Sequence, residues 1–142
     1  MQGSSYGDTL TGNAGANGLS GGDGGDLLTG GGGGDSLWGG AGGDRFVFQS
    51  LTDSAVSTRD TVYDFSHADG DRIDLSGIDA IVNGKNDAFT LVSGFTHKAG
   101  ELVSLYSVDH YLVQGDVNGD GIADFAINVF AGAPLVSGDF LL

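Results

Sequence analysis

Large apolar residues recur at every ninth position through the first third of the chain, in a background of small and polar residues. They are Leu10, Leu19, Leu28, Leu37 and Phe46. An oxygen-bearing side chain stands two positions before each of them, as Asp8, Asn17, Asp26, Asp35 and Asp44. A unit with one apolar residue cannot bury that residue alone, so such units must stack. The spacing predicts a coil of short strands with two repeats to a turn and apolar residues inside.

After Val47 glycine becomes rarer, and apolar residues alternate with polar ones as in half-buried strands. We expect strands at 61–65, 72–75, 89–92, 101–106, 108–114 and 125–129, with a turn at residues 69–70. Segments 51–58 and 76–82 are predicted to be short helices or loops. The second part should form an antiparallel sheet or sandwich that closes the end of the coil. We therefore divide the chain into a repeat region, residues 1–48, and a cap, residues 49–142.

Three tandem repeats in residues 21–47 fit the pattern Gly-Gly-x-Gly-x-Asp-x-U-x, where U is apolar. This nonapeptide is typical of β-helix repeats that bind Ca²⁺. Glycine reaches the φ > 0 conformations of a tight turn without steric cost, and Ca²⁺ takes its ligands from carboxylate and carbonyl oxygens. The predicted carboxylate ligands are Asp26, Asp35 and Asp44, and the predicted carbonyl donors are Gly21, Gly22, Gly24, Gly30, Gly31, Gly33, Gly39, Gly40 and Gly42.

The two preceding repeats are degenerate. Asp8 keeps its carboxylate in a repeat that has lost the second and fourth glycines, and Asn17 replaces Asp in the next repeat. Asp8 can complete a site with Asp26 on one edge of the coil, and Asn17 can offer a neutral oxygen opposite Asp35 on the other. A flexible glycine-rich linker is the alternative, but it does not explain the fixed phase of Asp and apolar residues. We expect about three or more Ca²⁺ ions.

The net charge of −14 changes the list of possible partners. Only one acidic residue, Glu101, is not Asp. This acidity excludes nucleic acid as a partner, because phosphates are bound by Lys and Arg. No apolar run approaches ~18 residues, so neither a membrane-spanning helix nor stable membrane insertion is expected. The chain has no cysteine, so metal ions rather than disulfides would have to stabilise the fold.

Two further acidic groups each admit two interpretations. Asp53, Asp60 and Asp64 can hold another ion at the junction, or they can cap turns through side-chain hydrogen bonds. Residues 116–124 have oxygen-bearing side chains at several positions of an EF-hand-like loop. Ile127 stands where that loop needs a bidentate Glu, so a hairpin turn is the favoured interpretation there.

Trp38 should face outward, either as a platform on which a sugar stacks or, as we favour, packed under a neighbouring segment. The three histidines, His67, His97 and His110, are scattered along the sequence. The chain contains no His-Glu-x-x-His zinc motif and no spacing that resembles a nucleophile motif. We therefore expect no catalytic activity from this chain.

Several segments beyond the glycine loops narrow the class of domain. They are Asp60-Thr-Val-Tyr-Asp-Phe65, Asp71-Arg-Ile-Asp-Leu-Ser-Gly-Ile-Asp-Ala80, residues 115–129 and the ending Ser137-Gly-Asp-Phe-Leu-Leu142. Together with the nonapeptides they resemble the C-terminal RTX domain of serralysin-type metalloproteases over essentially the whole chain.

The resemblance implies an all-β fold, a right-handed parallel β-roll with rows of Ca²⁺ along both edges. It also implies a monomeric, extracellular module that follows an upstream catalytic domain, a zinc metalloprotease or another exported hydrolase. Export would use a type I secretion system that reads the C-terminus, and Asp139-Phe-Leu-Leu142 matches the acidic and apolar ending of the family.

A carbohydrate-binding module is the alternative, since similar repeats occur in alginate epimerases. An anionic polysaccharide would need a basic stripe on one face of the roll. The only cationic side chains besides histidine are Arg45, Arg59, Arg72, Lys85 and Lys98.

Overall fold

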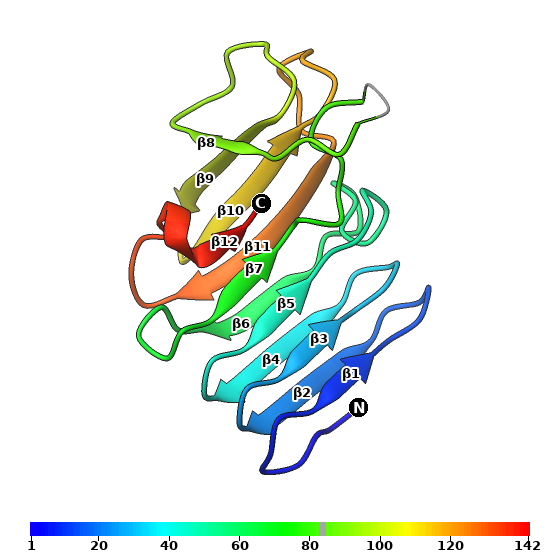
Figure 1. Ribbon diagram of the computed structural model, residues 1–142, viewed down its shortest axis with the longest axis vertical. Coiled ribbons are helices and arrows are strands. Elements are labelled where there is room, and N and C mark those ends of the chain that lie inside the picture. Colours follow the sequence, from blue (N-terminus) through cyan, green and yellow to red (C-terminus); the bar gives the residue numbers. More distant parts are fainter. Residues whose placement is uncertain (83–84) are drawn as a thin grey trace.

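The computed structural model describes residues 1–82 and 85–142 and contains two β-sheets that face each other (Figure 1). The smaller sheet is parallel throughout. Its five strands are, in spatial order, β1 (Thr9–Thr11), β3 (Leu27–Thr29), β5 (Arg45–Val47), β7 (Arg72–Asp74) and β12 (Phe140–Leu141).

The larger sheet has seven strands and mixes parallel with antiparallel pairing. In spatial order they are β2 (Gly18–Asp23), β4 (Ser36–Ala41), β6 (Thr61–Phe65), β11 (Phe125–Ala131), β10 (His110–Asp116), β9 (Glu101–Ser107) and β8 (Thr90–Val92). Strands β2, β4, β6 and β11 run parallel, as do β8 and β9, whereas β10 is antiparallel to both of its neighbours, β9 and β11.

Consecutive repeats alternate between the two sheets, so that each strand pairs with the strand two repeats later. Leu10 lies opposite Leu28, and Leu19 lies opposite Leu37. All five predicted inward residues are buried, the most exposed being Leu10 at 6%. The predicted parallel roll with two repeats per turn is therefore confirmed, and its core is a column of apolar side chains between the sheets.

The parallel pairing continues beyond residue 48. Strand β6 adds to β4, and β7 adds to β5, so the second part of the chain extends both sheets of the roll. The expected antiparallel strands are present as β9, β10 and β11, but they belong to the same sheet as the repeats because β11 joins β6. An open strand edge has unpaired N–H and C=O groups, and the later strands satisfy those of β6 and β7.

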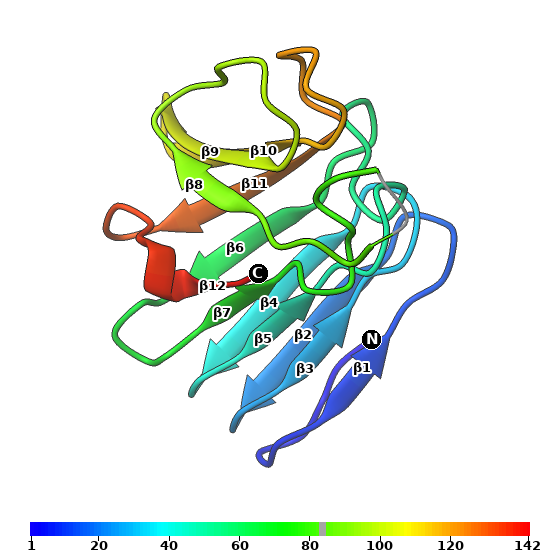
Figure 2. The ribbon, with the colours of Figure 1, turned by 45° about the horizontal axis from the view of Figure 1, so that its top comes forward.

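Segments 51–58 and 76–82 form turns and bends, so the loop alternative is correct for both. One short 3₁₀ helix, η1 (Ser137–Asp139), was not anticipated. It precedes β12, which places the end of the chain beside β7 (Figure 2). Within the described residues no helix combines the length and apolar character needed to cross a membrane.

Candidate metal-binding edges

Six glycines of the three intact repeats adopt positive φ. They hold the second and fourth positions of each repeat and are Gly22, Gly24, Gly31, Gly33, Gly40 and Gly42. Their φ values lie between 91° and 116°, a region that side chains with a Cβ rarely adopt. Ser4 and Tyr6 occupy these positions in the first repeat without positive φ. The first loop therefore takes a different path from the intact ones.

The sixth-position residues form two rows along the edges of the roll. The first row contains Asp8, Asp26, Asp44 and Asp71. From Asp26 on, Oδ1 of each carboxylate accepts a hydrogen bond from the backbone N–H of the row member one turn earlier, at 2.7–2.8 Å. The second row, bonded in the same way at 2.7–2.8 Å, contains Asn17, Asp35 and Asp60.

Four of these carboxylates keep one oxygen without a partner. Among the described residues, the buried carboxylate oxygens that lack a hydrogen bond are Oδ2 of Asp26, Asp35, Asp44 and Asp60. A buried polar atom without a partner costs about 1–3 kcal/mol, and a charged one costs more. Four such atoms arranged in two regular rows are a repeated feature of the fold, and their chemistry suits a cation.

The first glycine of each repeat leaves room beside this free oxygen. A Cβ on Gly30 would collide with Asp35 Oδ2, and one on Gly39 would collide with Asp44 Oδ2. A Cβ on Gly21 would collide with Asp26 Oδ2 and would also lie 2.5 Å from the carbonyl oxygen of Gly39 in the next turn. Carboxylate and carbonyl oxygens therefore meet at a space that only glycine leaves open. Ca²⁺ prefers this donor set.

The electrostatics of the rows are unfavourable for bare carboxylates. Burial raises the pKa of Asp44 to about 6, and the neighbouring charges of Asp71, Asp26 and Asp64 add to the effect. Burial, together with the charges of Asp35 and Asp53, raises the pKa of Asp60 to about 8. The pKa values of Asp35 and Asp71 are also raised, mainly by burial. A divalent cation at the edge would offset this repulsion and favour the charged forms.

Asp8 differs from Asp26 and Asp44 of its row. Its Oδ2 accepts hydrogen bonds from the backbone N–H of Ser4 at 2.6 Å and from the Ser4 hydroxyl at 2.8 Å. These bonds lower the pKa of Asp8. The frayed first loop thus satisfies its carboxylate internally, which the intact loops do not do.

The three acidic residues of the junction separate into different roles. The carboxylate of Asp53 accepts hydrogen bonds from the Gln49 and Ser50 backbone and from the Ser50 hydroxyl, as a turn cap does. Asp64 accepts the backbone N–H groups of Gly39 and Gly40 at 2.9 and 3.0 Å. Asp60 is a member of the second row. Of the three, Asp60 alone has a buried oxygen without a hydrogen-bond partner.

The loop at residues 116–124 is filled with internal hydrogen bonds. Asp116 accepts backbone N–H groups from Asn118, Gly119 and Gly121. Asp124 accepts the Val117 N–H on one oxygen and the Asn118 side-chain amide on the other. These bonds occupy both oxygens of each carboxylate, as in the favoured hairpin interpretation.

The repeat pattern in the sequence did not identify two members of the rows. Asp71 continues the first row, and its Oδ2 accepts the Ser66 N–H at 2.8 Å. Ser54 ends the second row, where its hydroxyl accepts the Asp60 N–H at 2.8 Å. The sequence does contain a pattern that could have identified Asp71. The end of the repeat, an Asp followed two positions later by an apolar residue, recurs as Asp60-Thr-Val62 and Asp71-Arg-Ile73.

Trp38 faces outward and stacks on Tyr63 of β6, with ring centroids 4.7 Å apart. One face of the indole packs on the neighbouring segment, as favoured, but no segment covers the residue, which stays 38% exposed, so packing does not exclude the platform interpretation. No set of three or more His, Cys, Asp or Glu side chains converges on one point in residues 1–82 and 85–142. Any ion at the edges must therefore take many of its ligands from backbone carbonyls.

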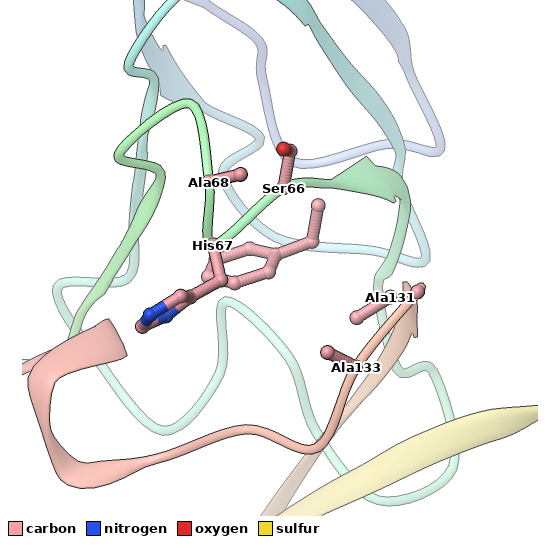
Figure 3. A pocket seen from close by; sticks show the side chains of 7 residues that line it. Ser66, His67, Ala68, Ala131 and Ala133 are labelled. Carbon is pink, nitrogen blue, oxygen red and sulfur yellow. The ribbon is translucent and has the colours of Figure 1, made fainter.

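One pocket of about 370 Å³ lies between the turn after β6 and the end of β11 (Figure 3). Its lining is mainly apolar, with Phe65, Ala131 and Ala133 among the contributors. The His67 ring points toward η1, where Nδ1 lies 2.5 Å from Oδ1 of the buried Asp139. This pair ties the C-terminal tail to the turn.

The fold and its edges define an all-β parallel roll built from nonapeptide repeats. The family model described as "Peptidase M10 serralysin C terminal" matches residues 12–142. The chain therefore belongs to this family, the C-terminal, non-catalytic part of serralysin-type proteases. RTX-type families of this kind generally bind calcium. No curated protein shows significant sequence similarity to the chain.

Two solved structures from the Azotobacter vinelandii mannuronan C5-epimerase are similar to the chain. Its AlgE6R2 subunit is 25% identical with a TM-score of 0.64, and the match covers 99% of this chain and 91% of that subunit. Its AlgE6R3 subunit is 26% identical with a TM-score of 0.57, covering 98% of this chain and 80% of that subunit. Both support the β-roll assignment.

We expect Asp35→Ala to weaken Ca²⁺ binding more than Asp8→Ala does. Asp35 has an unpartnered oxygen in an intact loop, whereas Ser4 already satisfies Asp8. Loss of an outer-shell partner alone costs about 10–100-fold in metal affinity, so losing Asp35 should raise the calcium midpoint at least tenfold. Isothermal titration of both variants measures this.

Asp35→Asn is the matched control, because it keeps the acceptor for the Asn17 N–H and removes only the charge. Equal midpoints for Asp8→Ala and Asp35→Ala would contradict the assignment.

The calcium-free fold should lose stability as pH rises. The folded chain holds protons on Asp44 up to about pH 6 and on Asp60 up to about pH 8, while their ordinary pKa is 3.8. Since the folded state binds more protons than the unfolded state in this window, its stability falls with increasing pH. Circular dichroism in calcium-free buffer should show more β-structure at pH 5 than at pH 8. The double variant Asp44→Asn/Asp60→Asn should flatten this dependence, and an unchanged slope would refute the cause given.

Proposed function

We propose that the chain is a non-catalytic calcium-binding RTX module of an exported hydrolase, with a serralysin-like zinc metalloprotease as the parent. Residues 1–48 supply most of the ion-binding loops, and residues 49–142 close the roll and carry the C-terminal type I secretion signal. The module folds outside the cell when calcium binds, as a monomer attached to the upstream catalytic domain.

The single observation that supports this proposal is the set of four unpartnered Oδ2 atoms on Asp26, Asp35, Asp44 and Asp60. They lie in two rows, and those of the three intact repeats border the space that the first glycine of the repeat leaves open. At each position, bound Ca²⁺ would supply two positive charges and would be coordinated by several oxygens. The residues of the two rows would hold it, together with carbonyls of the glycine loops.

The chain needs such ions because its repeats are weak folding units by themselves. Each repeat contributes one large apolar side chain to the core, and glycine loses more backbone entropy on ordering than any other residue. The rows also bring like charges together within the buried edges. Because the sites do not exist in the unfolded chain, the free energy of binding becomes free energy of folding. The calcium concentration then decides whether the roll forms.

The position of the C-terminal tail fits export before folding. Asp139 is fully buried and Phe140 is 6% exposed, while β12 is hydrogen-bonded along β7. Leu141 accepts a backbone hydrogen bond from Leu75 at 2.8 Å. A secretion machinery that reads this tail would therefore find it accessible only in the unfolded chain. Low cytoplasmic calcium would keep the chain in that state.

The cationic residues do not favour a module for anionic polysaccharide. Arg45 and Arg72 are neighbours on β5 and β7, but Arg45 is bonded to Asp74 and Arg72 donates to the Asp71 carbonyl. The other three, Arg59, Lys85 and Lys98, lie in separate loops. Within the described residues these five positions form no continuous basic stripe.

Calcium should convert the chain from a largely disordered state to a β-rich one. Extracellular calcium modules bind at about 10⁻⁴–10⁻³ M, so the transition should occur in that range. Far-ultraviolet circular dichroism in EDTA, followed by titration with Ca²⁺, measures it. Magnesium is the control ion, since its small octahedral shell suits such loops poorly. A fully native spectrum in EDTA at neutral pH would show that calcium does not drive folding.

Removal of residues 139–142 should abolish export through a type I system and leave calcium binding intact. The deleted tail is hydrogen-bonded to β7, Leu75 and His67, and among the described residues it makes no hydrogen bond to the loops of the intact repeats. Secretion from a host that carries the transporter, and calcium titration of the purified variant, give the two readouts. The matched control is His67→Ala, which removes the bond to Asp139 but keeps the tail sequence and should still be exported. Secretion of the shortened chain would place the signal further inside.

A further inference from the structure

The outer face of the seven-stranded sheet carries a row of aromatic rings on four adjacent strands. Trp38 of β4 stacks on Tyr63 of β6 at 4.7 Å with 9° between the ring planes. Tyr63 stacks on Phe130 of β11 at 5.4 Å and 7°, and His110 of β10 follows at 5.2 Å from Phe130. The stacked rings cover one another's faces, so the middle of this aromatic row presents only ring edges to a ligand.

Trp38 ends the aromatic row and keeps one face of its indole without an aromatic partner among the described residues. Tyr63 covers the face toward β6, and the residue opposite Trp38 on β2 is Ser20, which is small. Two positions earlier stands Gly18, where an added Cβ would meet no atom within 4 Å. The space over Gly18 is therefore open, and beyond Ser20 the row continues with the exposed Gln2, which pairs with Ser20. The indole therefore stands above the surface formed by the small residues of β2.

Two rows of positions on this face carry no acidic side chain. The positions in register with the aromatic row and with the row beside it hold no Asp or Glu. They are Ser20, Trp38, Tyr63, Phe130 and His110, and then Gly18, Ser36, Thr61, Asn128 and Leu112. The chain neighbours Asp64 and Asp109 are engaged by backbone N–H groups and by His110, respectively. A surface without charge, on a protein of net charge −14, selects an uncharged ligand.

We propose that this face binds an uncharged polysaccharide, with one sugar ring stacked on the open face of Trp38. A sugar ring has an apolar C–H face and a rim of hydroxyls. The indole suits the first, and the neutral side chains of Ser20, Ser36, Thr61 and Asn128 suit the second as donors and acceptors. A polyanion would meet repulsion from the surrounding carboxylates. A second copy of this chain would bring two molecules of charge −14 together.

The test uses the intact chain in millimolar Ca²⁺, where its single tryptophan reports on the site by fluorescence. Cellohexaose and laminarihexaose serve as uncharged probes, and an alginate hexamer serves as the anionic one. We expect a saturable change with an uncharged hexamer and none with alginate. Isothermal titration should show at least about a tenfold weaker Kd for Trp38→Ala, which corresponds to the loss of about 1.4 kcal/mol.

Two further variants separate binding from folding. Ser20→Leu fills the open space beside the indole and should abolish binding with an unchanged circular dichroism spectrum. Tyr106→Ala is the control, because Tyr106 is 64% exposed but lies one position from Leu105 and so points to the opposite face of the sheet. Its affinity should stay within about twofold of the unaltered chain.

Three outcomes would overturn the proposal. They are the absence of a response to both uncharged hexamers, binding of alginate alone, and unchanged affinity in both Trp38→Ala and Ser20→Leu. Sedimentation that shows a dimer, abolished by Trp38→Ala, would likewise assign the face to a second copy of the chain and not to a polysaccharide.

Discussion

Each turn of the roll is joined to the next by an Asp carboxylate that uses one oxygen inside the protein. Oδ1 accepts the backbone N–H of the row member one turn earlier, and this bond fixes the carboxylate in place. Oδ2 then points to the space beside the first glycine of the repeat and stays unpaired in Asp26, Asp35 and Asp44. The same residue therefore sets the register of the strands and offers an unpaired carboxylate oxygen. In the proposed function, structure and ion binding would be linked through this single side chain.

The glycines make this arrangement possible and also make it weak. Positive φ at the second and fourth positions lets the loop turn, and the missing Cβ at the first position leaves the space for an ion. Both features require a flexible chain with little apolar surface to bury. In the proposed function, bound cations would supply the stability that the small core does not. Such dependence would suit a chain that is exported unfolded and folds outside the cell.

The second part of the chain adds elements that the repeats lack. It continues both sheets, ends the rows with Ser54 and Ser66, and returns the C-terminus to β7 through η1 and β12. It also supplies Tyr63, Phe130 and His110, which line up with Trp38 of the repeat region. The edges of the roll are thus acidic and the outer face of its larger sheet is neutral. The two proposed sites would therefore take ligands of different chemistry on one molecule.

The nine-residue period by itself predicted the parallel roll, the buried column from Leu10 to Phe46 and the residues at the sixth position of each repeat. This was possible because each repeat is a local unit whose pattern can be recognised without its neighbours. The period breaks where insertions enter. Asp60 follows Asp35 by 25 residues, and Asp71 follows Asp44 by 27, yet both occupy the next rung of their rows. Only the tertiary structure decided this, since hydrogen-bond register is insensitive to the length of a loop that leaves and re-enters the sheet. No local sequence pattern specifies that β11 pairs with β6. The residues that lie next to Trp38 depend on this pairing, so they too follow only from the tertiary structure.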